Sequence, residues 1–197
     1  MNRFNELEKI ANENGGVLLT SAIVAAGISK PTLADFVKKN GYERVGRGIY
    51  CSQESWRDNL YLLQLRCPET VFSHETALFL LDMTDQEPFQ YSVTAKTGYN
   101  PSHLAEDGVK VFTVKKDLFD LGKTEAQTPF GHKVILYDPE RTVCDMIRSR
   151  SEMEIQSVQD ALKRYSRRKD KNLHKLMEYA NLFHVDKRLN LYLEVLL

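Results

Sequence analysis

Glycines divide the first fifty residues into short elements, and their spacing constrains what the segment can fold into. Gly15 and Gly16 end one helical pattern, and Gly27 separates two further short ones. Gly46-Arg47-Gly48 then predicts a tight turn between two short β-rich stretches. We therefore expect three short helices followed by a hairpin, whose apolar residues close on one another.

Apolar residues at helical spacing place these three helices. The first covers residues 4–14, and the second covers residues 22–26 behind a hydroxyl N-cap at 20–21. Ser29 caps the third helix, which ends before an Asn-Gly pair at 40–41. The inward face of this helix carries Leu33, Phe36 and Val37.

The second and third predicted helices form a helix-turn-helix, and residues 42–51 form a β-hairpin wing beside it. In such a fold the later helix of the pair enters the major groove of DNA. Residues 27–50 hold five basic and two acidic side chains, a net charge of +3. We expect the following residues to contact DNA: Ser29, Lys30, Thr32, Lys38, Lys39, Arg44 and Arg47. The alternative is a solvated face whose lysines only keep the protein in solution.

Beyond residue 52 the pattern predicts a larger unit of mixed structure. One helix covers 54–66 and another begins at Ser73. Three short β-rich stretches predict a small sheet: 89–94, 109–114 and 133–137. Asp138-Pro139 begins a further helix, and three amphipathic helices follow. We expect an α+β protein with a winged helix-turn-helix at residues 1–52 and a larger C-terminal domain, with a small sheet and several helices, at 53–197.

Charge is unevenly distributed although the formal total is zero. Residues 1–50 carry a net +2, residues 51–147 a net −6 and residues 148–197 a net +4. Within 163–175, seven basic residues accompany one acid, Asp170, and six of the seven define a possible second polyanion surface: Lys163, Arg164, Arg167, Arg168, Lys171 and Lys175. The alternatives are a solvated helix end, an RNA site or a partner site. Because the middle of the chain is acidic, we favour a contact with DNA.

No catalytic or metal-binding motif is complete. His74-Glu75 begins the zinc-protease pattern, but Leu78 occupies the position of the second histidine. The strand lysines Lys96 and Lys110 lack the carboxylate two residues earlier that a nuclease of the acid-x-Lys type has. A capping aspartate and an ion pair on a helix surface account for Asp138, Arg141 and Asp145. We therefore expect no catalytic residue, no metal and no cofactor.

Other features indicate a cytoplasmic protein without membrane contact. No apolar stretch approaches the roughly 20 residues that a membrane-spanning helix needs. The first residues form a charged amphipathic stretch and not the apolar core of a signal peptide. The cysteines, Cys51, Cys67 and Cys144, are too widely spaced to predict a disulfide framework or a zinc knuckle.

Six stretches follow one another along the chain: ISKPTL (28–33), VGRGIY (45–50), SHETALFLL (73–81), YDPERTVCDMIR (137–148), RKDKNLHKLMEYA (168–180) and YLEVLL (192–197). In this order they resemble the AbiE-type antitoxin family of bacterial abortive-infection systems, over nearly the whole chain. The resemblance implies a type IV antitoxin whose N-terminal domain binds operator DNA, in repeats upstream of its own operon, and represses that operon. It also implies that the C-terminal domain counteracts a nucleotidyltransferase-like toxin without a stable complex. It brings no catalytic residue.

Two other functions remain open on the sequence. One is a nuclease-related or nucleotide-processing enzyme that carries a DNA-binding module, which an assay of metal-dependent turnover would reveal. The other is a transcription factor whose second domain senses a small ligand, although no pocket signature supports it.

Overall fold

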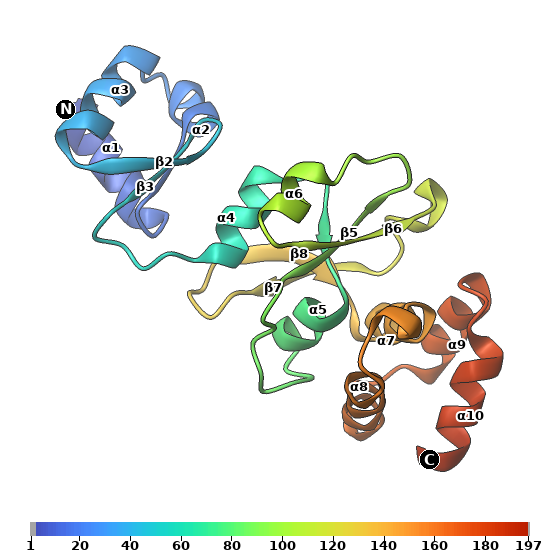
Figure 1. The fold of residues 1–197 in the computed structure, drawn as a ribbon. Helices are drawn as coiled ribbons and strands as arrows, with labels where there is room; N and C mark the ends of the chain where they lie inside the picture. Colours follow the sequence, from blue (N-terminus) through green and yellow to red (C-terminus); the bar gives the residue numbers. More distant parts are fainter. Residues whose placement is uncertain (1–2, 197) are drawn as a thin grey trace. The chain divides into compact units, whose positions relative to one another are not determined.

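The computed structural model describes residues 3–196, with side chains through residue 194, and the chain forms two compact units that divide between Pro68 and Glu69 (Figure 1). Each unit combines helices with its own β-sheet, and the expected α+β class is confirmed.

The first unit contains four helices and a three-stranded sheet. Its elements are α1 (Arg3–Glu13), β1 (Val17–Leu19), α2 (Thr20–Ala25), α3 (Lys30–Lys39), β2 (Tyr42–Gly46), β3 (Ile49–Ser52) and α4 (Asn59–Arg66). The strands pair antiparallel in the order β1-β3-β2, with Val17 opposite Cys51 and Arg44 opposite Tyr50. The predicted three helices and wing are therefore present.

Alternating residues of this sheet support two separate clusters of apolar side chains. Leu18 packs with residues of α1, α2 and α3, which include Leu7, Ile23 and Phe36. On the opposite face, Val17, Ile49 and Cys51 pack against Leu62 of α4. Helix α4 thus belongs to the first unit, and the domain boundary expected after residue 52 lies after Pro68 in the structure.

Two local expectations for this unit are wrong, and strand β1 is an element that the sequence did not predict. The first wrong expectation is the hydroxyl N-cap of α2, since the N-cap is Leu19, which makes no side-chain cap bond. The backbone amide of Thr20 instead donates to the carbonyl of Gly48 in the wing turn at 2.8 Å. The helix expected over 54–66 begins only at Asn59, because Asp58 caps it by accepting a hydrogen bond from the amide of Tyr61.

The second unit is built on a five-stranded mixed sheet. Its strands are β4 (Val71–Phe72), β5 (Ser92–Lys96), β6 (Lys110–Val114), β7 (Lys123–Gln127) and β8 (Lys133–Tyr137), in the order β6-β5-β4-β8-β7. Its α-helices are α5 (His74–Leu80), α6 (Ser102–Glu106), α7 (Pro139–Arg148), α8 (Ile155–Arg167), α9 (Leu173–Leu182) and α10 (Asp186–Leu196), and two 3-10 turns cover Lys116–Leu118 and Arg150–Glu152.

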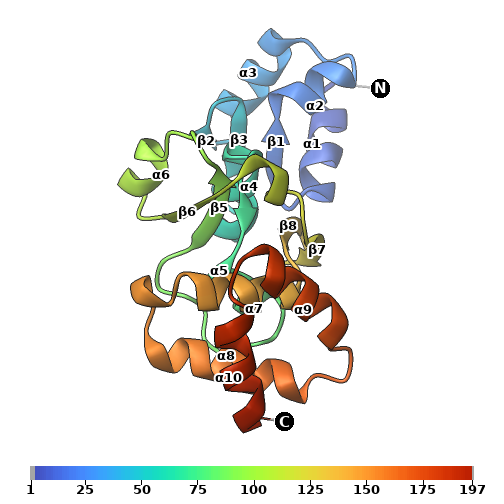
Figure 2. The ribbon, with the colours of Figure 1, turned by 90° about the vertical axis from the view of Figure 1, so that its right-hand side faces the viewer.

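Helix α7 is the centre of this unit, and α8, α9 and α10 gather around it (Figure 2). Val143 and Ile147 of α7 share a core with Tyr137 of β8, Leu162 of α8 and Leu176 of α9. Asp138 caps α7 as expected by accepting a hydrogen bond from the amide of Arg141 at 2.8 Å. This packing makes most of α7 inaccessible to solvent.

The expected strands are present, with one displacement. The stretch 133–137 is a strand over the predicted residues and 109–114 begins one residue later, whereas the strand expected at 89–94 runs from Ser92 to Lys96. Phe89 is consequently fully exposed in the loop before β5. Strands β4 and β7 and helix α6 were not expected from the sequence.

Candidate nucleic-acid interface

A short turn sets helix α3 relative to α2 in the first unit. Gly27 adopts a φ of +79°, in the left-handed region that favours glycine, and its amide bonds to the carbonyl of Val24. Ser29 then caps α3 as predicted, since its hydroxyl accepts a hydrogen bond from the amide of Thr32. The two hydroxyls of Ser29 and Thr32 lie 2.8 Å apart. These two candidate contact residues therefore also fix the start of the helix.

The two sides of α3 differ in chemistry as predicted. Leu33 and Phe36 are buried and Val37 is half-buried against the core. Lys30, Asp35, Lys38 and Lys39 are exposed. The ammonium group of Lys39 lies 5.3 Å from the centre of the Phe4 ring, so its aliphatic chain also covers the core. The solvent side of α3 thus presents a row of cations with a single acid.

The wing adds two arginines to this unit. Arg47 is exposed at the tip of the turn between β2 and β3. Arg44 lies on β2, and its Nε donates to the carbonyl of Gly46 at 3.2 Å, which holds the side chain along the turn. Within residues 3–196, Lys30, Lys38 and Arg47 have no ion-pair partner. These three cations are available to phosphates.

Arg57 is a residue of this surface that the sequence did not predict. Its guanidinium forms an ion pair with Glu43 on β2, and Gln53 donates a second hydrogen bond to the same carboxylate at 3.1 Å. Glu43 is the acid of the wing, and Arg57 neutralises it next to Arg44. Spacing along the chain carries no signal for this pair, because Arg57 follows the wing in an irregular segment.

The basic run at 163–175 is largely engaged within the second unit. Arg164 forms a two-pronged ion pair with Asp85, and Arg168 does the same with Asp170 while donating to the carbonyl of Leu81 at 2.8 Å. The remaining contacts join Lys163 to Asp160, Lys171 to the carbonyl of Arg168, and Lys175 to Asp138 and Glu140. Arg167 is exposed, with no ion pair to another described residue. A second polyanion surface here stays a prediction.

Lys175 differs from the other cations of the run because it forms ion pairs with two acids, Asp138 and Glu140, at the start of α7. Desolvation lowers the pKa of its ammonium group, but the hydrogen bond to Asp138 at 2.9 Å and the nearby Glu140 outweigh this, so the pKa is raised. The residue therefore joins the start of α9 to the start of α7. Its position favours a structural role over a contact with DNA.

His74 is enclosed in the core of the second unit. Its ring stacks on Phe112 at 3.5 Å, and its two nitrogens lie within hydrogen-bonding distance of the hydroxyls of Ser73 and Ser149. Burial, with Arg148, Lys110 and Arg141 nearby, holds the pKa of His74 well below its usual value. A neutral, fully buried imidazole of this kind serves packing. No group of three or more metal-ligating side chains gathers anywhere in residues 3–196.

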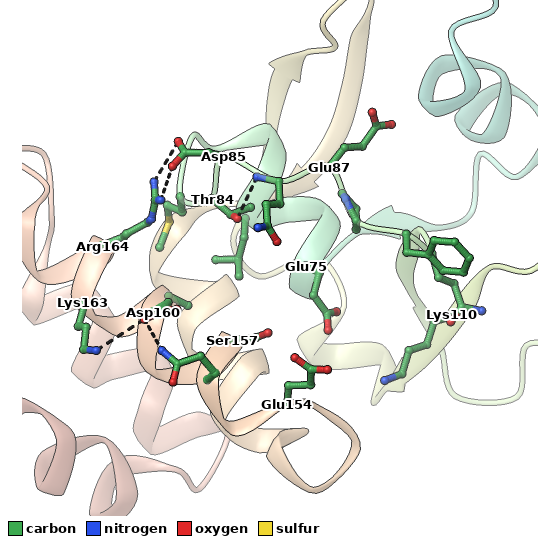
Figure 3. Close-up of a pocket in the computed structure, with 18 of the residues that line it drawn as sticks. Glu75, Thr84, Asp85, Glu87, Lys110, Glu154, Ser157, Asp160, Lys163 and Arg164 are labelled. Carbon is green, nitrogen blue, oxygen red and sulfur yellow. Dashed lines mark hydrogen bonds and ion pairs between the residues drawn. The ribbon is translucent and has the colours of Figure 1, made fainter.

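A cavity of about 880 Å³ lies between α5, α8 and the loop before β5 in the second unit (Figure 3). Its walls carry acids and bases alike, and several already pair with each other, such as Asp85 with Arg164 and Asp160 with Lys163. Glu75 and Glu154 face each other across the space (Figure 3). This mixed lining selects neither anions nor cations.

No helix within residues 3–196 combines the length and the apolar character that crossing a membrane requires.

Comparison with known proteins connects the winged helix to a family. The fold is similar to the crystal structure of the RV2827C protein from Mycobacterium tuberculosis, with a TM-score of 0.58 and 14% sequence identity, over 95% of this chain and 78% of that chain. At this identity the likeness concerns the fold alone. No protein with a curated description matches the chain. Residues 5–53 match the family model described as "Transcriptional regulator, AbiEi antitoxin". The N-terminal region of this chain is therefore similar to the AbiEi antitoxin family of transcriptional regulators.

Proposed function

We propose that this protein is the antitoxin of a bacterial abortive-infection system and represses its own operon by binding operator DNA through α3 and the wing. The observation that carries this proposal is the placement of exposed cations on the solvent side of α3 and at the wing tip, in a region of the AbiEi family. A helix-turn-helix places the later helix in the major groove, and lysines and arginines around it bind phosphates.

Within this site, Lys30 and Lys38 on α3 and Arg47 on the wing have no ion pair to another described residue and serve as phosphate contacts. Lys39 and Arg44 are held against the unit by Phe4 and by the carbonyl of Gly46, so their cations are pre-positioned. Ser29 and Thr32 lie at the start of α3, where side chains of a recognition helix contact base edges.

The C-terminal unit is proposed to counteract a nucleotidyltransferase-like toxin without a stable complex, in the cytoplasm. The operator is expected in repeat sequences upstream of the operon. Both statements rest on the resemblance of the whole sequence to AbiE-type antitoxins. Co-expression of the neighbouring gene tests the first statement: the wild-type protein should restore growth, and immobilised purified toxin should not retain the wild-type protein on a column. Footprinting of the DNA upstream of the operon tests the second.

The test of DNA binding uses a charge-matched pair of double variants. Lys38→Ala with Arg47→Ala removes two cations from the proposed site, whereas Arg3→Ala with Lys9→Ala removes two from α1. If each cation of the first pair contacts one phosphate, the slope of log K against log salt flattens by about 1.8. The α1 control should keep the wild-type slope. An unchanged slope in the first variant would exclude α3 and the wing as the interface.

A stronger variant replaces Lys38, Lys39, Arg44 and Arg47 by Ala together. It should abolish operator shifts while the circular dichroism spectrum stays unchanged. Turnover of DNA or nucleotides by the purified wild-type protein with Mg²⁺ would instead support the enzyme alternative.

A further inference from the structure

The C-terminal unit carries an apolar groove with a basic rim between α8 and α10. The groove has a volume of about 500 Å³, and its apolar lining residues are Leu162, Leu191 and Tyr192. Its basic lining residues, which we call the rim, are Arg150, Lys163 and Arg188, and none of the described residues that line the groove is acidic. Leu191 is 66% exposed, which is unusual for a leucine beside a well-packed core.

The same unit presents a feature of opposite chemistry. The loop before β5 reads Asp85-Gln86-Glu87-Pro88-Phe89, and the ring of Phe89 is fully exposed. Glu87 points away from helix α8 and accepts a hydrogen bond from the hydroxyl of Tyr91 at 2.7 Å (Figure 3). An aromatic side chain next to a carboxylate complements an apolar groove surrounded by cations.

This loop is held in place before it meets any partner. Asp85 is fixed by the two-pronged ion pair with Arg164, and the amide of Gln86 donates to the hydroxyl of Thr84 at 3.3 Å. A loop that is already ordered loses little conformational entropy when it binds. The exposure of Phe89 therefore belongs to a preformed feature.

From this complementarity we infer that two copies of the chain associate through their C-terminal units, with the Phe89 loop of each copy in the α8–α10 groove of the other. Lys163 of α8 lines both the groove and the cavity beside the loop, so the two features lie on either side of one helix. A two-fold axis beside α8 then buries both features twice, which is the isologous arrangement of most homodimers. The inference concerns the C-terminal unit and does not depend on DNA binding.

Sedimentation of the full-length protein without DNA tests the association. The wild-type chain should change from monomer to dimer over a micromolar concentration range. Phe89→Ser and Leu191→Glu should each weaken dimerisation at least about tenfold, because both remove a central apolar contact. Phe130→Ser is the matched control, since Phe130 is also exposed but lies in the turn between β7 and β8. This control should dimerise like the wild type.

A mixing experiment distinguishes this pairing from other modes of association. Glu87→Lys places a cation opposite the basic rim, and Arg150→Glu with Arg188→Glu places acids opposite the loop, so each variant alone should stay monomeric. Mixed together, the two variants should form a heterodimer, since both loop–groove contacts again join opposite charges. A monomeric wild type, dimerisation that survives Phe89→Ser and Leu191→Glu, or failure of the mixture to associate would each overturn the inference. Binding of an acidic protein by a wild type that stays monomeric would assign the groove to that protein instead.

Discussion

Arg141 and Asp145 form an ion pair that is completely enclosed in the second unit. The Nε of Arg141 donates to Oδ2 of Asp145 at 2.9 Å, and neither side chain is exposed. The guanidinium lies over the ring of Tyr137 at 3.9 Å and over that of Phe183 at 4.2 Å. Its Nη1 donates to the carbonyls of Leu118 and Leu121. The expected ion pair on a helix surface is therefore a buried one that joins α7 to the loop before β7.

Removal of Asp145 should be severely destabilising. Asp145→Ala leaves the guanidinium of Arg141 buried without its counter-charge, which costs about 3–5 kcal/mol of unfolding free energy. Asp160→Ala is the control, because its partner Lys163 and the aspartate itself are both about half-exposed. We expect the control to change stability by less than about 1 kcal/mol. Far-UV circular dichroism is the appropriate probe, since the single tryptophan, Trp56, lies in the first unit. Equal losses in the two variants would contradict this expectation.

His74 should make the second unit less stable in mild acid. Because burial lowers its pKa in the folded state, the unfolded chain takes up a proton at a higher pH than the folded one. The free energy of unfolding is then independent of this group above about pH 6.5. As the pH falls below that value, the free energy of unfolding decreases by up to about 1.4 kcal/mol per pH unit. His74→Asn should flatten this dependence, even if the variant is less stable at every pH.

The control for this measurement is His174→Asn, since His174 is exposed on α9. Urea unfolding at several pH values between neutrality and mild acid gives the slope for each variant. A His74→Asn slope equal to that of the wild type would show that other groups cause the acid sensitivity.

The position of α4 predicts how the first unit can be isolated. A fragment of residues 1–68 retains the contacts of Leu62 with Val17, Ile49 and Cys51, whereas a fragment of residues 1–52 leaves that face of the sheet exposed. Burial of one leucine contributes about 1.5–3 kcal/mol. Thermal unfolding should therefore be cooperative for 1–68 and occur at a clearly lower temperature for 1–52. Leu62→Ala in the longer fragment should reproduce much of the difference, and equal melting temperatures of the two fragments would rule out this role of α4.

Local signals explain which elements the sequence predicted. The Ser29 cap of α3, the Gly46–Gly48 turn and the Asp138 cap of α7 each depend on neighbouring residues only. Strands β1, β4 and β7 have two to five residues and obtain their stability from pairing, so their own sequences carry little signal. The polar sequence KTEAQ of β7 is a strand because it pairs along the whole of β8.

The features of the candidate site likewise fall into those that local sequence signals predict and those that depend on tertiary packing. Cations on α3 and at the wing follow from helical spacing and turn residues. The pairing of Arg57 with Glu43, and of the basic run with acids far along the chain, depends on tertiary packing. An i,i+4 pair such as Arg141 and Asp145 looks the same in sequence whether it is exposed or buried.

The basic run at 163–175 allows its structural and its DNA-binding roles to be measured separately. Arg168→Ala removes the hydrogen bond to the carbonyl of Leu81, and bonds to charged groups contribute about 1.5–3 kcal/mol. We therefore expect the triple change of Arg164, Arg167 and Arg168 to Ala to destabilise the second unit by more than the roughly 0.5 kcal/mol of an ordinary surface change.

Arg167 and Lys169 are exposed cations without an ion-pair partner in the described part of the chain, so their removal tests polyanion binding without this structural cost. If both contact phosphates, Arg167→Ala with Lys169→Ala flattens the salt slope of operator binding by about 1.8 and leaves sequence preference unchanged. Most other cations of the run already neutralise acids of the same unit, so a second polyanion surface depends on Arg167 and Lys169. A flattened slope at wild-type stability would establish the second polyanion surface, and loss of toxin rescue with normal operator binding would connect the run to the antitoxin activity.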